Sequence, residues 1–232
     1  MPSAERSLVS LEREVTQCRA CPRLVAWREA VAADPPKRHR GEDYWGRPVP
    51  AFGDPGASIV VVGLAPAANG ANRTGRMFTG DRSGDWLFAA LHRAGLASQA
   101  ESVHAGDGLR LSAVWISAVV RCAPPQNKPT TQERDRCLPY LARELELLPA
   151  ARVLVALGAF GWDGALRTLE ELGHDIPSPR PRFGHEAEAR VGGLTLLGSY
   201  HPSQQNTFTG KLTADMLDSV FARAKELSRR RP

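Results

Sequence analysis

The stretch ASIVVVGLAPAANGANRTGRMFTGD, residues 57–81, decides the fold, because an unbroken apolar run passes straight into a glycine-rich loop. Three more apolar runs follow it, at residues 111–120, 151–158 and 194–200. Continuous runs of this kind are typical of strands buried on both faces, as parallel strands are. The sequence therefore predicts four parallel β-strands.

Amphipathic helix patterns alternate with these strands. One covers about residues 84–95, and another begins at Thr130 with a capping box that ends on Glu133. The apolar stripe of this second helix consists of Leu138, Leu141, Leu145 and Leu148. A last helix is expected over about residues 209–227, with Leu212, Met216, Val220 and Leu227 toward the sheet. The alternation predicts an α/β fold in which helices cover both faces of a mostly parallel sheet.

Length and composition indicate one domain over residues 1–232, since the chain has 232 residues and 42% of them are apolar. Residues 32–56, rich in proline, glycine and charge, predict an irregular strap. No window approaches eighteen consecutive apolar residues, and the N-terminus lacks the apolar core of a signal peptide. We therefore expect a cytoplasmic protein that does not bind membranes.

The charge balance gives weak evidence about partners. The formal net charge is +5, which favours a polyanionic partner but falls short of a dedicated charge-neutralising protein. The clearest basic cluster lies in the tail at residues 228–232, where the plainer interpretation is a frayed, solvated end.

Three polar loops follow the predicted strands: the loop at 63–81, RCAPPQN at 121–127 and YHPSQQN at 200–206. The carboxyl ends of parallel strands meet at one edge of the sheet, and ligands bind there. We therefore place the functional site where these loops converge.

The glycine-rich loop does not match either common phosphate-binding pattern. It lacks Gly-x-Gly-x-x-Gly, and the near miss to a P-loop at 70–77 lacks the lysine and the metal-binding hydroxyl. We therefore expect no nucleotide cofactor.

The side chains of the loop suit a nucleobase instead. Phe78 can stack, Asp81 can accept a proton, and amides and guanidinium groups are supplied by Asn69, Asn72, Arg73 and Arg76. The alternative is that Phe78 belongs to the core and that Asp81 only caps the next helix.

Four cysteines supply the number of thiolates that a [4Fe–4S] cluster requires: Cys18, Cys21, Cys122 and Cys137. Zinc also takes four cysteines, but its usual sites use two closely spaced pairs, which Cys122 and Cys137 do not form. The spacing favours a cluster, and it leaves zinc and incidental cysteines open.

Taken together, GLAPAANGANRTGRMFTGDRSGDWL, RCAPPQNKPT, GSYHPSQQNTFTGKLT and the cysteine pattern resemble the uracil-DNA glycosylase superfamily, and within it the type-5 group of bacteria and archaea. The resemblance covers nearly the whole chain. It implies a three-layer α/β/α sandwich around a four-stranded parallel sheet, a structural [4Fe–4S] cluster, and removal of uracil and other deaminated bases, hypoxanthine included, from DNA. The cluster would join residues 1–56 to the sheet.

The resemblance assigns the flipped base to the first loop. Phe78 stands where the superfamily places its stacking aromatic, and backbone groups of Ala67, Ala68 and Asn69 would read the edge of the base.

The same resemblance assigns three catalytic residues. His201 would donate a hydrogen bond to the departing base anion, and Asn127 would bind the base or orient water. The segment GLAPAA has no polar side chain where better-known members carry a carboxylate or amide, so Asp81 is the candidate for positioning water. In isolation, His201 would fit a structural histidine and Asn127 a turn residue.

The resemblance also implies a DNA surface, with a loop that enters the minor groove and opens the stack. The expected DNA contacts are Arg73, Arg76, Ser203, Gln204, Gln205, Asn206, Thr209 and Lys211. Thr209 is equally the expected N-cap of the last helix, and Lys211 a solvated residue of its first turn. The expected partner is DNA, double-stranded and also single-stranded, bound by a monomer associated with the nucleoid.

Two other functions remain open. One is a noncatalytic iron–sulfur protein that recognises DNA damage, suggested by the missing polar group in GLAPAA. The other is an enzyme that acts on free nucleosides. The absence of a lysine at a lyase position in the three loops predicts that a glycosylase would leave an abasic site without cutting the strand.

Overall fold

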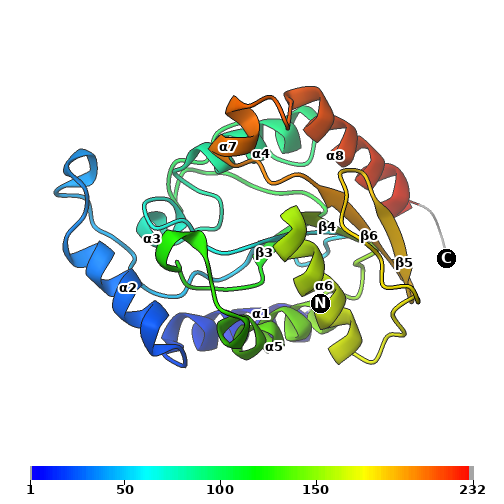
Figure 1. Ribbon diagram of the computed structural model, residues 1–232, viewed down its shortest axis with the longest axis horizontal. Helices are drawn as coiled ribbons and strands as arrows, with labels where there is room; N and C mark the ends of the chain where they lie inside the picture. Colours follow the sequence, from blue (N-terminus) through cyan, green and yellow to red (C-terminus); the bar gives the residue numbers. More distant parts are fainter. Residues whose placement is uncertain (1, 230–232) are drawn as a thin grey trace.

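The computed structural model describes residues 2–229 (Figure 1). Its centre is four parallel strands in the order β3-β2-β4-β6. Their bounds are β2 Ile59–Gly63, β3 Val114–Ala118, β4 Val153–Leu157 and β6 Leu194–Ser199. The prediction of four parallel strands is confirmed, and each strand is one to five residues shorter than its apolar run.

Two antiparallel edge strands extend this sheet to six strands. The first, β1 (Phe52–Gly53), pairs with β3, and β5 (Glu188–Val191) pairs with β6. The count of four was therefore too low, because neither edge strand resembles a doubly buried run. β1 has only two residues, and β5 alternates exposed and buried side chains.

The strands alternate their side chains between two apolar layers. Val60 and Val62 face one core, which α5 (Thr131–Leu147) and α6 (Gly158–Glu171) cover, and α1 (Pro2–Gln17) packs against α5. Ile59 and Val61 face the other core, which α4 (Arg82–Arg93) and α8 (Ala214–Arg229) cover. Figure 1 shows the two helical layers on opposite sides of the sheet, so the three-layer sandwich is confirmed.

The capping box of α5 is present as predicted. Thr130 Oγ1 accepts a hydrogen bond from the Glu133 backbone N–H, and the Glu133 carboxylate accepts one from the Thr130 N–H. All four leucines of the predicted stripe are buried: Leu138, Leu141, Leu145 and Leu148.

The predicted last helix is wrong at its N-terminus. Ser203 caps a separate short helix, α7 (Gln204–Phe208). Its C-cap is Thr209, and Gly210 follows with φ +70°. Thr209 is thus a C-cap residue rather than an N-cap, and α8 starts only at Ala214. The glycine adopts the left-handed conformation that ends helices, which the apolar stripe alone does not reveal.

The N-terminal region crosses the carboxyl edge of the sheet. After α2 (Pro22–Ala33) the chain forms a 3₁₀ turn, η1 (Lys37–His39), and then runs largely irregularly to β1, as predicted for the strap. The strap is attached by backbone hydrogen bonds from Trp45 N to Arg73 O and from Gly46 N to Asn72 O, residues of α3 (Ala71–Thr74).

The basic tail lies mostly outside the described residues. Of residues 228–232, the first two complete α8, and nothing further is described. Between Pro2 and Arg229, none of the helices combines the length and apolar composition that crossing a bilayer requires.

A buried ion pair joins the sheet to α5. Arg121 Nη2 lies 2.8 Å from Glu144 Oε2, and both side chains are almost completely buried. Ser117 Oγ of β3 donates a 2.7 Å hydrogen bond to the same carboxylate. Glu144 therefore compensates a cation that has no access to water.

Replacing Glu144 with alanine should destabilise the fold by about 3 to 5 kcal/mol, because Arg121 would remain charged and buried. Chemical denaturation measures the change. Glu146→Ala, an exposed position on the same helix, is the matched control and should leave the midpoint unchanged. Equal stability of the two variants would show that this ion pair does not support the fold.

Candidate active site

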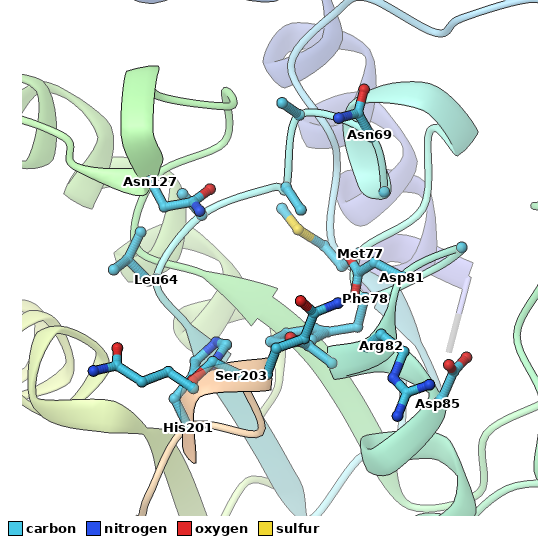
Figure 2. Close-up of a pocket in the computed structure, with 18 of the residues that line it drawn as sticks. Leu64, Asn69, Met77, Phe78, Asp81, Arg82, Asp85, Asn127, His201 and Ser203 are labelled. Carbon is cyan, nitrogen blue, oxygen red and sulfur yellow. The ribbon is translucent and has the colours of Figure 1, made fainter. Parts of the chain in front are cut away.

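The three predicted loops meet around one cavity of about 1040 Å³ at the carboxyl edge of the sheet (Figure 2). Among the residues expected to act on the base or on DNA, those lining this main cavity are Ala67, Ala68, Asn69, Phe78, Asp81, Asn127, His201, Ser203, Gln204 and Gln205. The predicted convergence of the loops is confirmed, because residues some 140 positions apart in the chain share one cavity.

Phe78 lies against His201 at the centre of the cavity (Figure 2). Their ring centroids are 6.0 Å apart and the ring planes are inclined by 33°. The Phe78 ring also covers Gly63 at the end of β2, where a Cβ would lie 2.6 Å from the ring. Phe78 has φ +53°, a conformation that aromatic residues rarely adopt and that must be held by its surroundings.

A buried polar network provides that support. Arg76 donates hydrogen bonds to Thr79 Oγ1 at 3.0 Å, Ser102 Oγ at 2.7 Å and Asp107 Oδ2 at 2.6 Å. Burial alone would raise the pKa of Asp107, but Arg76 and backbone N–H groups hold it well below its usual range. The loop on both sides of Phe78 is therefore fastened to the segment 102–107.

This network corrects one predicted DNA contact. Arg76 is 93% buried and paired with Asp107, so its guanidinium has no free face for a phosphate. Arg73 is also engaged, in an ion pair with Glu42 and in hydrogen bonds to the carbonyl oxygens of Asn69 and Gly80. Both arginines organise the loop from within.

Asp81 occupies both positions that the sequence presented as alternatives. It is the N-cap of α4, since its Oδ1 accepts a 3.0 Å hydrogen bond from Gly84 N, and it also lines the main cavity. Burial raises the pKa of Asp81, while the N–H groups of Gly84 and Ser83 act in the opposite direction. The carboxyl is thus fixed in place and shielded from bulk water.

His201 comes two residues after the end of β6 at Ser199, and it lines the cavity. Asn206 Nδ2 donates a 2.8 Å hydrogen bond to the His201 carbonyl and holds the backbone. Part of the side chain remains exposed to the cavity, yet its surroundings are dense enough that desolvation lowers the pKa of the imidazole to about 4. The ring is therefore neutral at physiological pH.

Asn127 belongs to the short turn η2 (Pro125–Asn127) and is exposed at the rim of the cavity. Its φ is +56°, and that of the preceding Gln126 is +55°. Asparagine tolerates this conformation better than most residues do, and glutamine does not share that tolerance. Asn127 is thus a turn residue that also lines the cavity.

The remaining predicted DNA contacts separate into two groups. Ser203, Gln204 and Gln205 line the cavity on α7. Asn206, Thr209 and Lys211 do not: Thr209 Oγ1 donates to the Gln205 carbonyl, and Lys211 lies over the Tyr200 ring at 4.8 Å. Lys211 precedes α8 and is not in its first turn.

Other cavity residues were missed by sequence reasoning. The most informative are Arg38 and His39, which reach the cavity from the strap. Further members of the lining are Leu64, Ala65, Met77, Gly80, Arg82, Ser83, Asp85 and Gln126. The basic run KRHR at 37–40 was the available signal, but the sequence does not show where an irregular strap folds.

Phe208, at the end of α7, is 69% exposed. The guanidinium carbon of Arg82 lies 5.3 Å from its ring centroid. A large apolar side chain thus projects from the loop that was expected to open the base stack.

The four cysteines surround a second, smaller cavity: Cys18, Cys21, Cys122 and Cys137 all line it as free thiols. Burial raises the pKa of Cys122 to about 11 and that of Cys137 to about 12. Among residues 2–229, no three histidine, cysteine or acidic side chains are grouped tightly enough to hold one metal ion.

Two buried arginines accompany this cysteine cavity. Arg28 Nη1 donates to Cys122 Sγ at 3.0 Å, and the Arg121 backbone N–H donates to Cys137 Sγ at 3.3 Å. The Nε atoms of both arginines, and Arg121 Nη1, have no hydrogen-bond partner within the described part of the chain. These donors and charges suit an anionic group bound by the thiols.

Comparison with known proteins gives a consistent result. The family model of the Uracil DNA glycosylase superfamily matches residues 50–225. The chain is 54% identical to a Mycobacterium bovis protein named Type-5 uracil-DNA glycosylase, over 96% of this chain and 82% of that protein. Relatives with the same name from Mycobacterium leprae and Thermus thermophilus are each 51% identical, over 96% and 92% of this chain and 96% and 95% of their own lengths.

The lowered pKa of His201 predicts how stability depends on pH. The folded protein binds fewer protons at this position than the unfolded chain between pH about 6.5 and about 4, so stability falls as the pH falls. From pH 7 to pH 5, His201→Gln should lose about 2 kcal/mol less than the unchanged protein. Denaturation at both pH values measures this difference. His92→Gln, at an exposed histidine, should behave like the unchanged protein. If both substitutions have the same effect, His201 is not desolvated as described.

Proposed function

The chain belongs to the uracil-DNA glycosylase superfamily, and on that premise we propose that it removes uracil from DNA by hydrolysing the bond between base and sugar. One observation carries the proposal: a single cavity presents the Phe78 ring beside a neutral His201, with Asp81 and Asn127 around them. An aromatic platform, a neutral hydrogen-bond donor and a carboxylate are what base removal requires.

The substrate base would leave the duplex before the reaction. Rotating a nucleotide out of the stack costs a few kcal/mol, and less for a mispaired base such as one formed by deamination. The ring of the base would stack on Phe78, and the backbone of Ala67, Ala68 and Asn69 would meet its edge. Asn69 is well placed for this because Tyr44 Oη donates a 3.0 Å hydrogen bond to its side-chain oxygen and steadies it.

His201 would stabilise the leaving group. As the bond between sugar and base breaks, its electron pair moves onto the base, and an oxygen of the pyrimidine gains negative charge. With a pKa of about 4 the imidazole is neutral, and its single N–H can donate a hydrogen bond to this oxygen without transferring the proton. The sugar is left with positive character, which a nearby carboxylate stabilises.

Asp81 is the group we assign to the sugar side. Its ionised form would offset the positive sugar, hold the attacking water, and accept a proton as water adds to the sugar carbon. Asn127 would bind the base or orient this water. Leu64 and Ala65 line the cavity with apolar side chains, so no polar side chain there selects one base, which fits a range that extends to hypoxanthine.

The segment around α7 would engage DNA. Phe208 is exposed and apolar, as a residue that wedges between bases must be, and Ser203, Gln204 and Gln205 line the adjoining wall of the cavity. We propose that the enzyme acts as a monomer of one domain on double-stranded DNA and also on single strands. This substrate would place it at the nucleoid, and no lyase step would follow base removal.

A [4Fe–4S] cluster would bind at the cysteine cavity. The four thiols share that cavity, and the unpartnered N–H donors of Arg28 and Arg121 suit the negative charge of an iron–sulfur group with four thiolates. When bound, the cluster supplies a covalent link between the N-terminal helices and the sheet, and hydrolysis needs no redox step. Cys18 and Cys21 come from the N-terminal segment, Cys122 from the loop after β3, and Cys137 from α5.

The decisive test is release of uracil from a labelled duplex with one U·G pair. The unchanged enzyme should release it, and strand breaks should appear only after alkali. Asp81→Ala, Asn127→Ala and His201→Ala should each lower the single-turnover rate by about 10²-fold or more. Asp85→Ala, which removes another carboxylate that lines the cavity, is the matched control for Asp81 and should stay within a few-fold.

Other outcomes identify the alternatives. If the protein binds the duplex but releases neither uracil nor hypoxanthine, the result would indicate a damage-recognition protein and not a glycosylase. Activity on free nucleosides but not on DNA would indicate a nucleoside-processing enzyme. Strand breaks without alkali would contradict the monofunctional reaction.

The cluster is tested by metal content and absorbance rather than by activity. Protein purified without oxygen should contain about four irons per chain and absorb broadly in the visible blue. Cys137→Ala should abolish both and lower the unfolding temperature, whereas Ser102→Ala, which also alters a buried position, should retain the iron. Zinc in place of iron, or neither metal, would contradict the cluster.

A further inference from the structure

The main cavity has two walls that come from distant parts of the chain. One wall is α7, with Ser203, Gln204 and Gln205, and the other is the strap, with Arg38 and His39. Figure 1 shows the loop after α2 at the left end of the molecule and α7 separately at the top. A strand whose base enters the cavity between them would pass over both walls.

The strap wall is strongly basic and its charges are available. Lys37, Arg38 and Arg40 are exposed within a turn of four residues. Within residues 2–229, no acidic side chain forms an ion pair with any of the three. Of the acids close to the turn in the chain, Asp34, Glu42 and Asp43, the side chain of Glu42 is occupied by His39 and by Arg73.

A chain of contacts connects this turn to the loop beneath the base. His39 Nδ1 lies 2.7 Å from Glu42 Oε1, and Glu42 Oε2 lies 2.6 Å from Arg73 Nη1. Arg73 in turn donates hydrogen bonds to the carbonyl oxygens of Asn69 and Gly80, on either side of Phe78 in the cavity wall. The basic turn is therefore held at a defined place relative to the base site. A run of charged residues that contacted only solvent would have no such fixed position.

We propose that Lys37, Arg38 and Arg40 bind phosphates of the DNA strand that carries the extruded base, on the side of the cavity opposite α7. The inference rests on the proposed glycosylase function. Phosphate contacts set the position of a protein on DNA, and two separated walls would hold the strand on both sides of the flipped nucleotide. Fixed cations at one rim lower the cost of holding the backbone in that distorted form.

The test replaces all three side chains by glutamine, which removes the charge and keeps much of their length. Binding is measured by fluorescence anisotropy over a range of salt concentrations, with a duplex that carries a nonhydrolysable 2′-fluoro-deoxyuridine opposite guanine. The matched control removes three exposed arginines elsewhere, Arg13, Arg110 and Arg190, so that the change in net charge is the same. Arg110 precedes β3 and therefore lies toward the opposite edge of the sheet.

Removing one phosphate interaction should lower the slope of log affinity against log salt by about 0.9, and lower affinity at 0.1 M salt by about eightfold. The strap variant should show a decrease of at least this size, and the control should match the unchanged protein. Uracil release with enzyme far above the dissociation constant should stay within a few-fold of normal, because the turn binds DNA and does not touch the reacting atoms.

Two results would overturn the inference. One is a strap variant with the same salt slope and affinity as the control. The other is a large loss of single-turnover rate at saturating enzyme with unchanged affinity, which would place the turn in catalysis. If the unchanged enzyme releases no uracil at all, it is the proposed function that fails, and the binding assay still reports on the strap separately.

Discussion

The central constraint on this molecule is that four parallel strands are buried on both faces. Every residue of β2, β3 and β4 is inaccessible, and successive side chains enter opposite apolar cores. Apart from a few buried hydroxyls such as that of Ser117, which is bonded to Glu144, polar side chains are thereby excluded from the body of the sheet. Because the strands are parallel, their carboxyl ends share one edge. Residues from the loops after β2, β3 and β6 meet there although they are far apart in the sequence.

The proposed base site depends on a second, more local constraint. Phe78 can occupy its position only because glycine ends β2 beneath it and because the left-handed backbone is fastened on either side. The Arg76 and Asp107 pair supplies that fastening from inside the protein. Strain of about 1 to 3 kcal/mol at one residue is thus offset by a buried, charge-assisted network, and the ring is presented in one orientation.

The sequence was sufficient for features that follow from local chemistry or from a continuous pattern. The four central strands, the capping box at Thr130 and the convergence of three loops are of this kind. The edge strands were missed, since β5 is half exposed and β1 is minimal. The split between α7 and α8 depends on one residue, Gly210, whose left-handed backbone interrupts an otherwise continuous pattern.

The remaining wrong predictions concern side chains whose surroundings come from distant parts of the chain. Arg76 looked like a phosphate ligand because arginine in a polar loop usually is solvated, and only the fold brings Asp107 and Ser102 to it. Arg38 and His39 were overlooked for the converse reason, since an irregular strap has no period from which its path follows. Asp81 shows that two interpretations can hold together: the same carboxylate that caps α4 lines the cavity, so helix geometry fixes the position of the group proposed to hold water.

The helix α2 connects the cysteine cavity to the base site. Arg28 on this helix donates to Cys122, while its backbone carbonyl accepts a 3.2 Å hydrogen bond from Asn72 of α3. The helix begins directly after Cys21 and leads into the basic turn at Lys37. A group that binds all four cysteines would therefore hold α2 in place. Because α2 contacts the first loop and leads into the strap, the strap and the first loop would be held in fixed positions relative to one another. The proposed cluster would thereby have a physical connection to the proposed DNA binding, through the rigidity of one helix rather than through any redox chemistry.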